Sequence, residues 1–429
     1  MENRAPNNEP MAIARFVCAC PPESRDACAG EPRYGEIKGQ SYCVLHYPDD
    51  KDKQEQFQRA IKRKLANGDF DFRGVWFPTE QSFSRFEFRG RKVDFVDAVF
   101  NGPVRFRKAK FAKAAYFNRA RFRAGANFSQ VFFREGVNFT EAIFEDNVDF
   151  YYAHFISEVD FTVASFRSRV NFYGATFGDH VRFAGRENAV NITSLDLQFA
   201  RIEKPDRVYF HSLTARPSWF VNVDARRFDF INVRWDWDQA SIKSETASLL
   251  DREVSAPHRM LAIAYRRLAI NAEENHRYEE ASRLRFLAME SARLQRDDTS
   301  NERSKRFEVH VLSWCYWLVS GYGERVWQAS LVLSVILIVS AAIYMWVGFA
   351  RWQPELGRED DVAIVKRDDV GAPLPLSRAL IYSAAVMTLQ QPEPRPATTA
   401  ARSVVLIETV LGPLQAALLA LAIRRKFMR

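Results

Sequence analysis

Five residues near the start of the chain have the side chains and the spacing of a metal site. They are Cys18-x-Cys20, Cys28 and Cys43-x-x-His46, which include four of the five cysteines in the 429-residue sequence. Thiolate and imidazole are the usual ligands of structural zinc, which takes four of them in a tetrahedron. Five candidates compete for four positions, and we expect Cys28, Cys43 and His46 together with either Cys18 or Cys20. The alternative is a set of free thiols, buried or on the surface.

A single carboxylate, Glu408, interrupts the apolar run from Ser403 to Ile423. A charge within such a run is costly, so it faces either a partner or water. One helix face would carry Glu408, Gly412, Gln415 and Leu419, which recur at steps of four, three and four. The interpretation we favour is that this face lines a pore. The other is that it packs against a neighbouring helix, with Glu408 bonded there.

Two apolar runs are long enough to cross a bilayer of about 30 Å. They are residues 326–350, which carry no charge, and residues 403–423. Between them, residues 377–391 are apolar but too short to span, which is the length of a re-entrant helix. Lys and Arg precede the first run and follow the second, so we expect a two-pass protein of the inner (plasma) membrane with both termini cytoplasmic. The absence of an apolar run suited to a signal peptide and the clustered thiols agree with a reducing compartment. Residues 307–319 are expected to form an amphipathic helix on the membrane surface.

This segment order resembles the pore domain of two-transmembrane potassium channels over about residues 325–425. The local matches are Thr388-Leu389, after the expected pore helix, and Glu408-x3-Gly412. The resemblance implies a homo-oligomer, by analogy a tetramer, and a filter segment after the pore helix. The expected filter and pore residues are Thr388, Leu389, Gln390, Gln391, Glu393, Glu408, Gly412 and Gln415. The family's Thr-Val-Gly-Tyr-Gly sequence is absent, so potassium selectivity is not implied. Gly321-Tyr322-Gly323 precedes the first span and is expected to form an elbow.

Phenylalanine recurs from Phe95 to Phe183 with steps that alternate between five and six residues. A small or branched residue, such as Val93 or Ala98, stands two positions before most of them. An eleven-residue unit rich in Gly, Asn and Asp is typical of a β-solenoid rather than a coiled coil. Two units would make a coil of 22 residues with four inward columns of Phe, about 4.8 Å apart along each column. One column is Phe95, Phe117, Phe139, Phe161 and Phe183, and the others begin at Phe100, Phe106 and Phe111.

The pattern resembles the pentapeptide-repeat family, which implies a right-handed quadrilateral β-solenoid. Phe72, Phe77, Phe83 and Phe88 fit one further coil, and the pattern loosens beyond Phe183. The expected fold is mainly β and then α. Its expected regions are 1–50 (zinc-binding segment), 51–69 (capping helix), 70–238 (solenoid), 239–324 (helical linker) and 325–429 (pore-loop domain).

The composition excludes a wholly disordered chain and a small disulfide scaffold, since 47% of the residues are hydrophobic and cysteines are few. The net charge of +8 is unevenly placed, because Arg85–Arg134 is basic and Glu135–Asp160 is acidic. We interpret this as a solvated surface rather than a binding face, and we expect neither nucleic-acid binding nor DNA mimicry. We find no nucleotide-binding, hydrolase or metalloprotease motif, so we expect no enzyme.

The sequence therefore predicts an ion-channel-like membrane protein with a cytoplasmic solenoid that acts as a sensor or docking arm. The alternative is a non-conducting, membrane-anchored scaffold whose solenoid binds a protein partner.

Overall fold

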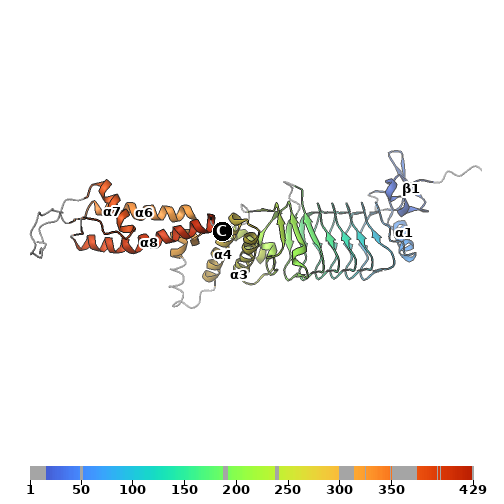
Figure 1. Ribbon diagram of the computed structural model, residues 1–429. Helices are drawn as coiled ribbons and strands as arrows, with labels where there is room; N and C mark the ends of the chain where they lie inside the picture. Colours follow the sequence, from blue (N-terminus) through green and yellow to red (C-terminus); the bar gives the residue numbers. More distant parts are fainter. Residues whose placement is uncertain are drawn as a thin grey trace, which may run out of the picture. The chain divides into compact units, whose positions relative to one another are not determined.

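The computed structural model describes residues 16–48, 52–186, 192–236, 241–298, 314–323, 325–347, 349, 374–393, 395–396 and 398–427. The chain divides into two compact units, Met1–Arg267 and Leu268–Arg429. The first unit is dominated by short strands stacked coil upon coil, and the second is helical (Figure 1).

The solenoid has four faces, each a ladder of short parallel strands. The first face contains β6 (Val93–Asp94), β10 (Ala115–Tyr116), β14 (Val137–Asn138), β18 (Val159–Asp160), β21 (Val181–Ala184), β24 (Val208–His211) and β26 (Asp229–Ile231). The second contains β3 (Trp76–Phe77), β7 (Val99–Phe100), β11 (Arg121–Phe122), β15 (Ile143–Phe144) and the start of β19 (Ser165–Asn171). The third contains β4 (Gln81–Ser82), β8 (Val104–Arg105), β12 (Ala126–Asn127), β16 (Val148–Asp149), the end of β19 and β22 (Ile192–Asp196).

The fourth face contains β5 (Glu87–Phe88), β9 (Lys110–Phe111), β13 (Phe132–Phe133), β17 (His154–Phe155), β20 (Thr176–Phe177) and β23 (Arg201–Ile202). A last pair is formed by β25 (Thr214–Ala215) and β27 (Arg234–Trp235). Ala115 pairs with Val93 on one side and Val137 on the other, which confirms a coil of 22 residues. The solenoid has about seven such coils.

Four columns of phenylalanine fill the solenoid, as predicted. Within each column the rings stack in near-parallel planes, with centroids between 4.5 and 5.4 Å apart. Phe72, Phe77, Phe83 and Phe88 extend all four columns by one coil. Beyond Phe183, the first column continues through Phe210 at 5.0 Å and Phe230 at 5.5 Å, whereas Phe220 packs edge-on against Phe210.

Tight turns close two of the four corners of each coil. Between the first and second faces, Ala98 N–H donates to the Phe95 carbonyl at 3.1 Å, and Asp97 lies at a φ of 58°. The equivalent position recurs every eleven residues and has positive φ even where it holds Val163 or Tyr152. Positive φ is uncommon outside glycine, and it is a clear outlier for a β-branched residue. Stacking of successive coils therefore holds the backbone in a conformation that these side chains disfavour.

The N-terminal end of the solenoid is capped by residues 16–48, here called the N-terminal head, and by α1 (Gln54–Ala66). The head contains the 3-10 turns η1 (Pro22–Ser24) and η2 (Asp26–Cys28) and the antiparallel pair β1 (Arg33–Ile37) and β2 (Gln40–Cys43). Phe57 of α1 is fully buried, with its ring 5.4 Å from that of Phe77 in the first coil. Gly68, at a φ of 64°, follows the end of α1.

The other end of the first unit has 3-10 turns η3 (Pro205–Arg207) and η4 (Pro217–Phe220) and helix α2 (Ile242–Leu250). Glu245 of α2 is fully buried, accepts the Ser218 backbone N–H at 2.8 Å and pairs with Arg216 at 3.1 Å. This pair joins α2 to the last coils.

The second unit is helical. Helix α3 (Pro257–Glu274) crosses the division between the units, and α4 (Tyr278–Asp298) follows it. Residues 314–320 are helical, whereas residues 307–313 of the expected amphipathic helix lie outside the described residues. The turn η5 (Gly321–Gly323), where all three residues have positive φ, forms the expected elbow. It is followed by α6 (Val326–Tyr344), α7 (Leu376–Met387) and α8 (Thr399–Phe427), here called the apolar helix bundle.

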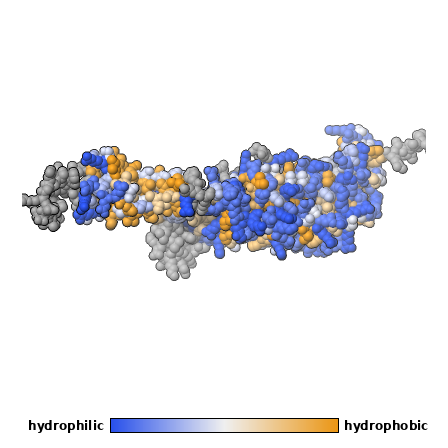
Figure 2. All heavy atoms as spheres, in the orientation of Figure 1, coloured by the Kyte–Doolittle hydropathy of each residue, from blue (hydrophilic) through white to orange (hydrophobic). Residues whose placement is uncertain are grey.

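Helices α6 and α8 are long and apolar enough to span a membrane, and only 17% of each apolar window is buried. The core helix of a soluble protein would be mostly buried. Large side chains such as Leu331, Ile338 and Val410 are more than half exposed. Figure 2 shows hydrophobic residues gathered on the surface of these helices, whereas the visible face of the solenoid is mostly hydrophilic.

Candidate metal centre and polar cluster

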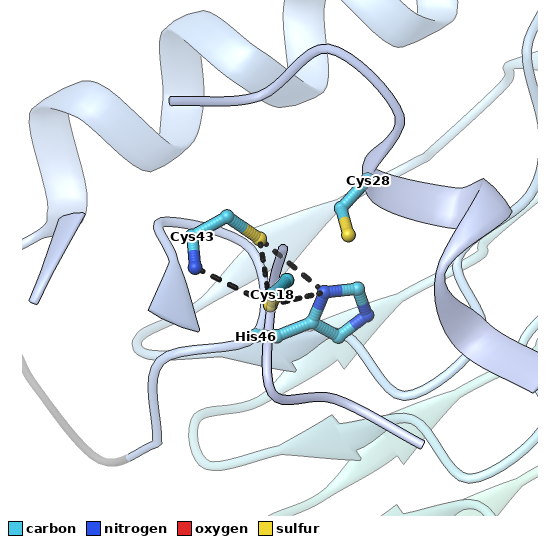
Figure 3. A group of neighbouring side chains, drawn as sticks. All are labelled: Cys18, Cys28, Cys43 and His46. Carbon is cyan, nitrogen blue, oxygen red and sulfur yellow. Dashed lines mark hydrogen bonds between the residues drawn. The ribbon is translucent and has the colours of Figure 1, made fainter. Parts of the chain in front are cut away.

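The candidate metal centre lies in the N-terminal head, where three chain segments meet. Cys18 precedes η1, Cys28 ends η2, Cys43 ends β2 and His46 follows in the next turn. All four side chains are buried, and their donor atoms lie within 4.8 Å of one another. Figure 3 shows the sulfur atoms and the imidazole ring turned toward a common centre.

The distances between the donor atoms suit an ion with tetrahedral coordination. Cys18 Sγ lies 3.7 Å from Cys43 Sγ and 3.8 Å from His46 Nδ1, and Cys43 Sγ lies 3.3 Å from His46 Nδ1. Metal–sulfur bonds of about 2.3 Å in a tetrahedron give a sulfur–sulfur edge of about 3.8 Å. The cluster can therefore hold a metal ion without a large rearrangement.

His46 is oriented by a hydrogen bond on its far side. Its Nε2 lies 2.9 Å from the carbonyl oxygen of Arg73, to which Nε2–H donates. This bond fixes the tautomer in which Nδ1 carries a free lone pair and faces the sulfur atoms. Because Arg73 belongs to the first coil, the same bond links the candidate centre to the solenoid. The sequence did not reveal this partner, since a backbone carbonyl leaves no residue-type signal.

The electrostatics of the four side chains also favour a cation. Hydrogen bonds from Cys28 and Cys43 lower the pKa of the Cys18 thiol, whereas hydrogen bonds with Cys18 and Cys43 raise the pKa of the Cys28 thiol. Three thiols this close cannot all ionise unless a positive charge lies among them.

Of the two open choices, Cys18 rather than Cys20 joins Cys28, Cys43 and His46 in the group of four. Cys20 is also buried, and its Sγ lies 3.9 Å from that of Cys28, so it is a neighbour of the group. None of the five cysteines forms a disulfide.

A second polar cluster lies between the three helices of the apolar bundle. Glu408 of α8 is 1% exposed and accepts hydrogen bonds from Tyr344 Oη of α6, at 2.5 Å, and from Ser383 Oγ of α7. Ser383 Oγ also lies 3.2 Å from the Leu337 carbonyl oxygen, so its single proton can be given to either acceptor. One carboxylate thus ties all three helices together. The sequence showed Glu408 but not its partners, because the relative rotation of packed helices is not encoded in spacing alone.

The rest of the Glu408 face is also in contact with the chain itself. At Gly412, a Cβ atom would lie 2.8 Å from the Met387 side chain, so the missing side chain lets α7 and α8 approach closely. Gln415 Nε2 donates to the carbonyls of Val319, at 3.0 Å, and Ala329, at 2.8 Å. This packing matches the alternative interpretation of the face, namely a helix contact with Glu408 bonded to a neighbouring span.

The expected filter residues lie together at the end of α7 and are exposed. They are Thr388, Leu389, Gln390, Gln391 and Glu393. Thr388 caps the helix, and Gln390 N–H reaches back to the Ala385 carbonyl at 2.9 Å. Leu389 has a φ of 61° and is 64% exposed. Glycine is the usual residue at such a helix end, so a bulky leucine there is strained.

The comparison with known families bears on the solenoid. Residues 95–143 and 139–185 match the family described as pentapeptide repeats (9 copies). No curated protein and no solved structure matches the chain. The resemblance seen in the phenylalanine spacing is thus supported for the region between Phe95 and Gly185.

Proposed function

We propose that this chain is a membrane-anchored pentapeptide-repeat protein whose solenoid is a docking arm for a protein partner. The observation that carries the proposal is that Glu408 finds its hydrogen-bond donors within the same chain. A pore-lining carboxylate would face water or a symmetry-related subunit, whereas Glu408 is buried between Tyr344 and Ser383. The bundle of α6, α7 and α8 is therefore complete as an anchor without a second copy.

In this proposal α6 and α8 cross the inner membrane, with both termini and the right-handed solenoid in the cytoplasm. The exposed apolar side chains of both helices supply the lipid-facing surface. The N-terminal head holds a structural zinc ion through Cys18, Cys28, Cys43 and His46, because thiolate and imidazole donors in a closed tetrahedron suit zinc. Zinc supplies order to the head, and the proposal assigns no reaction to the chain.

The test is the subunit count of the purified protein, together with its conductance in planar bilayers. The anchor predicts monomers or dimers and no current, both for the wild type and for Glu408→Gln. Stable tetramers that pass cations, with a conductance that Glu408→Gln alters, would overturn it.

The second candidate function is an oligomeric cation pore with α7 as a re-entrant helix. The exposed segment after α7 favours it, because a strained and exposed residue such as Leu389 marks a functional position more often than a structural one. In a tetramer these segments would meet on the symmetry axis. Cysteine crosslinking at Gln390 distinguishes the candidates, since only the pore predicts rapid disulfide formation between subunits.

A further inference from the structure

One corner of the solenoid, between its third and fourth faces, carries exposed basic and aromatic residues. Backbone hydrogen bonds run along this corner from coil to coil, linking Arg85 to Arg107, Lys108 to Ser129, Gln130 to Tyr151, and Tyr152 to Tyr173. Residues at equivalent positions of successive coils are therefore stacked in a line. Its first two coils present cations and its later coils present aromatic rings.

The aromatic part, here called the aromatic stripe, consists of Tyr151, Tyr152, Tyr173 and Phe199. Ring centroids lie 4.6 Å apart for Tyr151 and Tyr152, 5.7 Å for Tyr151 and Tyr173, and 5.2 Å for Tyr173 and Phe199. Tyr152 is 43% exposed and Phe199 is 56% exposed. Scattered exposed rings are normal on a protein surface, whereas four adjoining rings form a patch that folding alone does not require.

The backbone shows how the rings are placed at the surface. Tyr152 lies at a φ of 50° and Phe199 at 57°, so two bulky side chains occupy positions that favour glycine or asparagine. At Gly174, in the coil between them, a Cβ atom would lie 2.8 Å from the Tyr152 ring. The glycine thus leaves room for the ring to lie across the next coil. These φ values belong to the tight turn that recurs in every coil, so the turn accommodates the two rings at the surface.

Spacing and charge indicate what the stripe would bind. Rings in the column behind it are 5.0 and 4.7 Å apart, so two coils rise about 10 Å, which is close to the ~9.3 Å that three residues cover in a polyproline II helix. Surfaces lined by aromatic side chains bind proline-rich segments that adopt this helix. Among the described residues, Arg107 and Lys108 form no ion pair, and they lie two coils from Tyr151 on the same corner.

We propose that this corner binds a proline-rich segment of a partner protein, with its prolines on the aromatic stripe and an acidic residue beside Arg107 and Lys108. Single-stranded nucleic acid also stacks on aromatic rings, but the acidic run Glu135–Asp160, which has no Lys or Arg, lies in the same coils and would repel phosphate. The inference rests on the proposed docking role of the solenoid and does not depend on the membrane helices.

The test measures binding of a fluorescein-labelled peptide, PPLPPLPEE, to the full-length protein in nanodiscs by fluorescence anisotropy. We expect saturable binding that falls at least tenfold in Phe199→Gly and in Tyr152→Asn, and several-fold in Lys108→Glu. Both of the first two changes relieve backbone strain, so the melting temperature should stay the same or rise. Tyr209→Ala, on the first face, is the matched control and should bind normally.

A peptide ending in KK should bind more weakly than the EE peptide, and a single-stranded oligothymidine should not compete. Equal binding by wild type, Phe199→Gly and Tyr152→Asn would overturn the proposal, as would preference for the oligonucleotide. Failure of the peptide to bind would contradict this inference but not the proposed membrane anchor, which is tested separately by subunit count and conductance.

Discussion

The solenoid holds its large hydrophobic side chains in its interior, whereas the apolar helix bundle exposes many of them on its surface. In the solenoid, the phenylalanine columns are almost fully buried, and most lysine and arginine side chains lie outside. In the bundle, Leu331, Ile338 and Val410 face outward, and Glu408 and Gln415 are buried. The difference fits the proposed membrane anchor, in which the bundle exposes apolar side chains to lipid and the solenoid exposes charged side chains to water.

The largest expected effect follows from the buried columns. Phe139 is fully buried between Phe117, at 4.9 Å, and Phe161, at 5.2 Å. Phe139→Ala removes contacts on both sides and leaves a cavity, so we expect a loss of about 3 to 5 kcal/mol in the free energy of unfolding. Denaturant unfolding followed by circular dichroism measures it. Ile338→Ala, on the outward face of α6, is the contrasting variant and should cost far less in membranes.

Metal removal tests what orders the end of the solenoid. Cys43→Ser should reduce bound zinc from about one ion per chain to nearly none, because a hydroxyl is a poor fourth ligand. Hydrogen exchange in residues 16–48 should then rise, while the coils from Phe95 onward stay protected. Cys20→Ser is the matched control and should retain the metal. Zinc loss in Cys20→Ser with retention in Cys18→Ser would contradict the ligand set.

A change in the polar interior of the bundle should lower its free energy of unfolding by a smaller amount. Glu408→Leu leaves the Tyr344 hydroxyl without its acceptor, whereas Ser383 can still donate to the Leu337 carbonyl; the loss should be about 1 to 3 kcal/mol in the free energy of unfolding. Steric-trapping measurements of helix-bundle unfolding in bicelles can resolve this change. Leu406→Ala, at a position 69% exposed, should be close to neutral. If the Leu406 variant were the more damaging, the bundle would not have a polar interior.

The smallest expected effect is a small increase in the stability of the solenoid. Val163 lies at a φ of 57°, where a β-branched side chain is disfavoured. Val163→Asn should stabilise the solenoid by about 0.5 to 1 kcal/mol, seen as a higher melting temperature. Thr162→Asn, one residue earlier, should have no such effect, and equal gains from both would exclude relief of backbone strain as the cause.

The two regions also differ in how far the sequence determined them. The phenylalanine period predicted the coil length, the four columns and their spacing, because each coil contacts only its neighbours. It did not predict the extra residue between Phe88 and Phe95, which makes the first coil pair at 23 residues, as in Trp76 with Val99. The seven-residue step from Phe88 to Phe95 shows this insertion in the sequence, but the prediction of a uniform 22-residue coil did not take it into account.

In the bundle, hydropathy predicted the existence of α6, α7 and α8 but not their contacts. The polar residues Tyr344 and Ser383 were visible in otherwise apolar segments, yet only the packing shows that both donate to Glu408. The metal cluster was intermediate: spacing gave five candidates, and tertiary structure selected four of them.

Photocrosslinking in native-lipid vesicles tests the opposed organisation of the two regions most directly. Benzoylphenylalanine is introduced in place of Ile338 or Val410 in the bundle, and in place of Phe132 on the solenoid, all of which are exposed. We predict lipid adducts at positions 338 and 410 and none at position 132. Labelling of position 132 by lipid, or labelling of positions 338 and 410 by protein alone, would contradict the account.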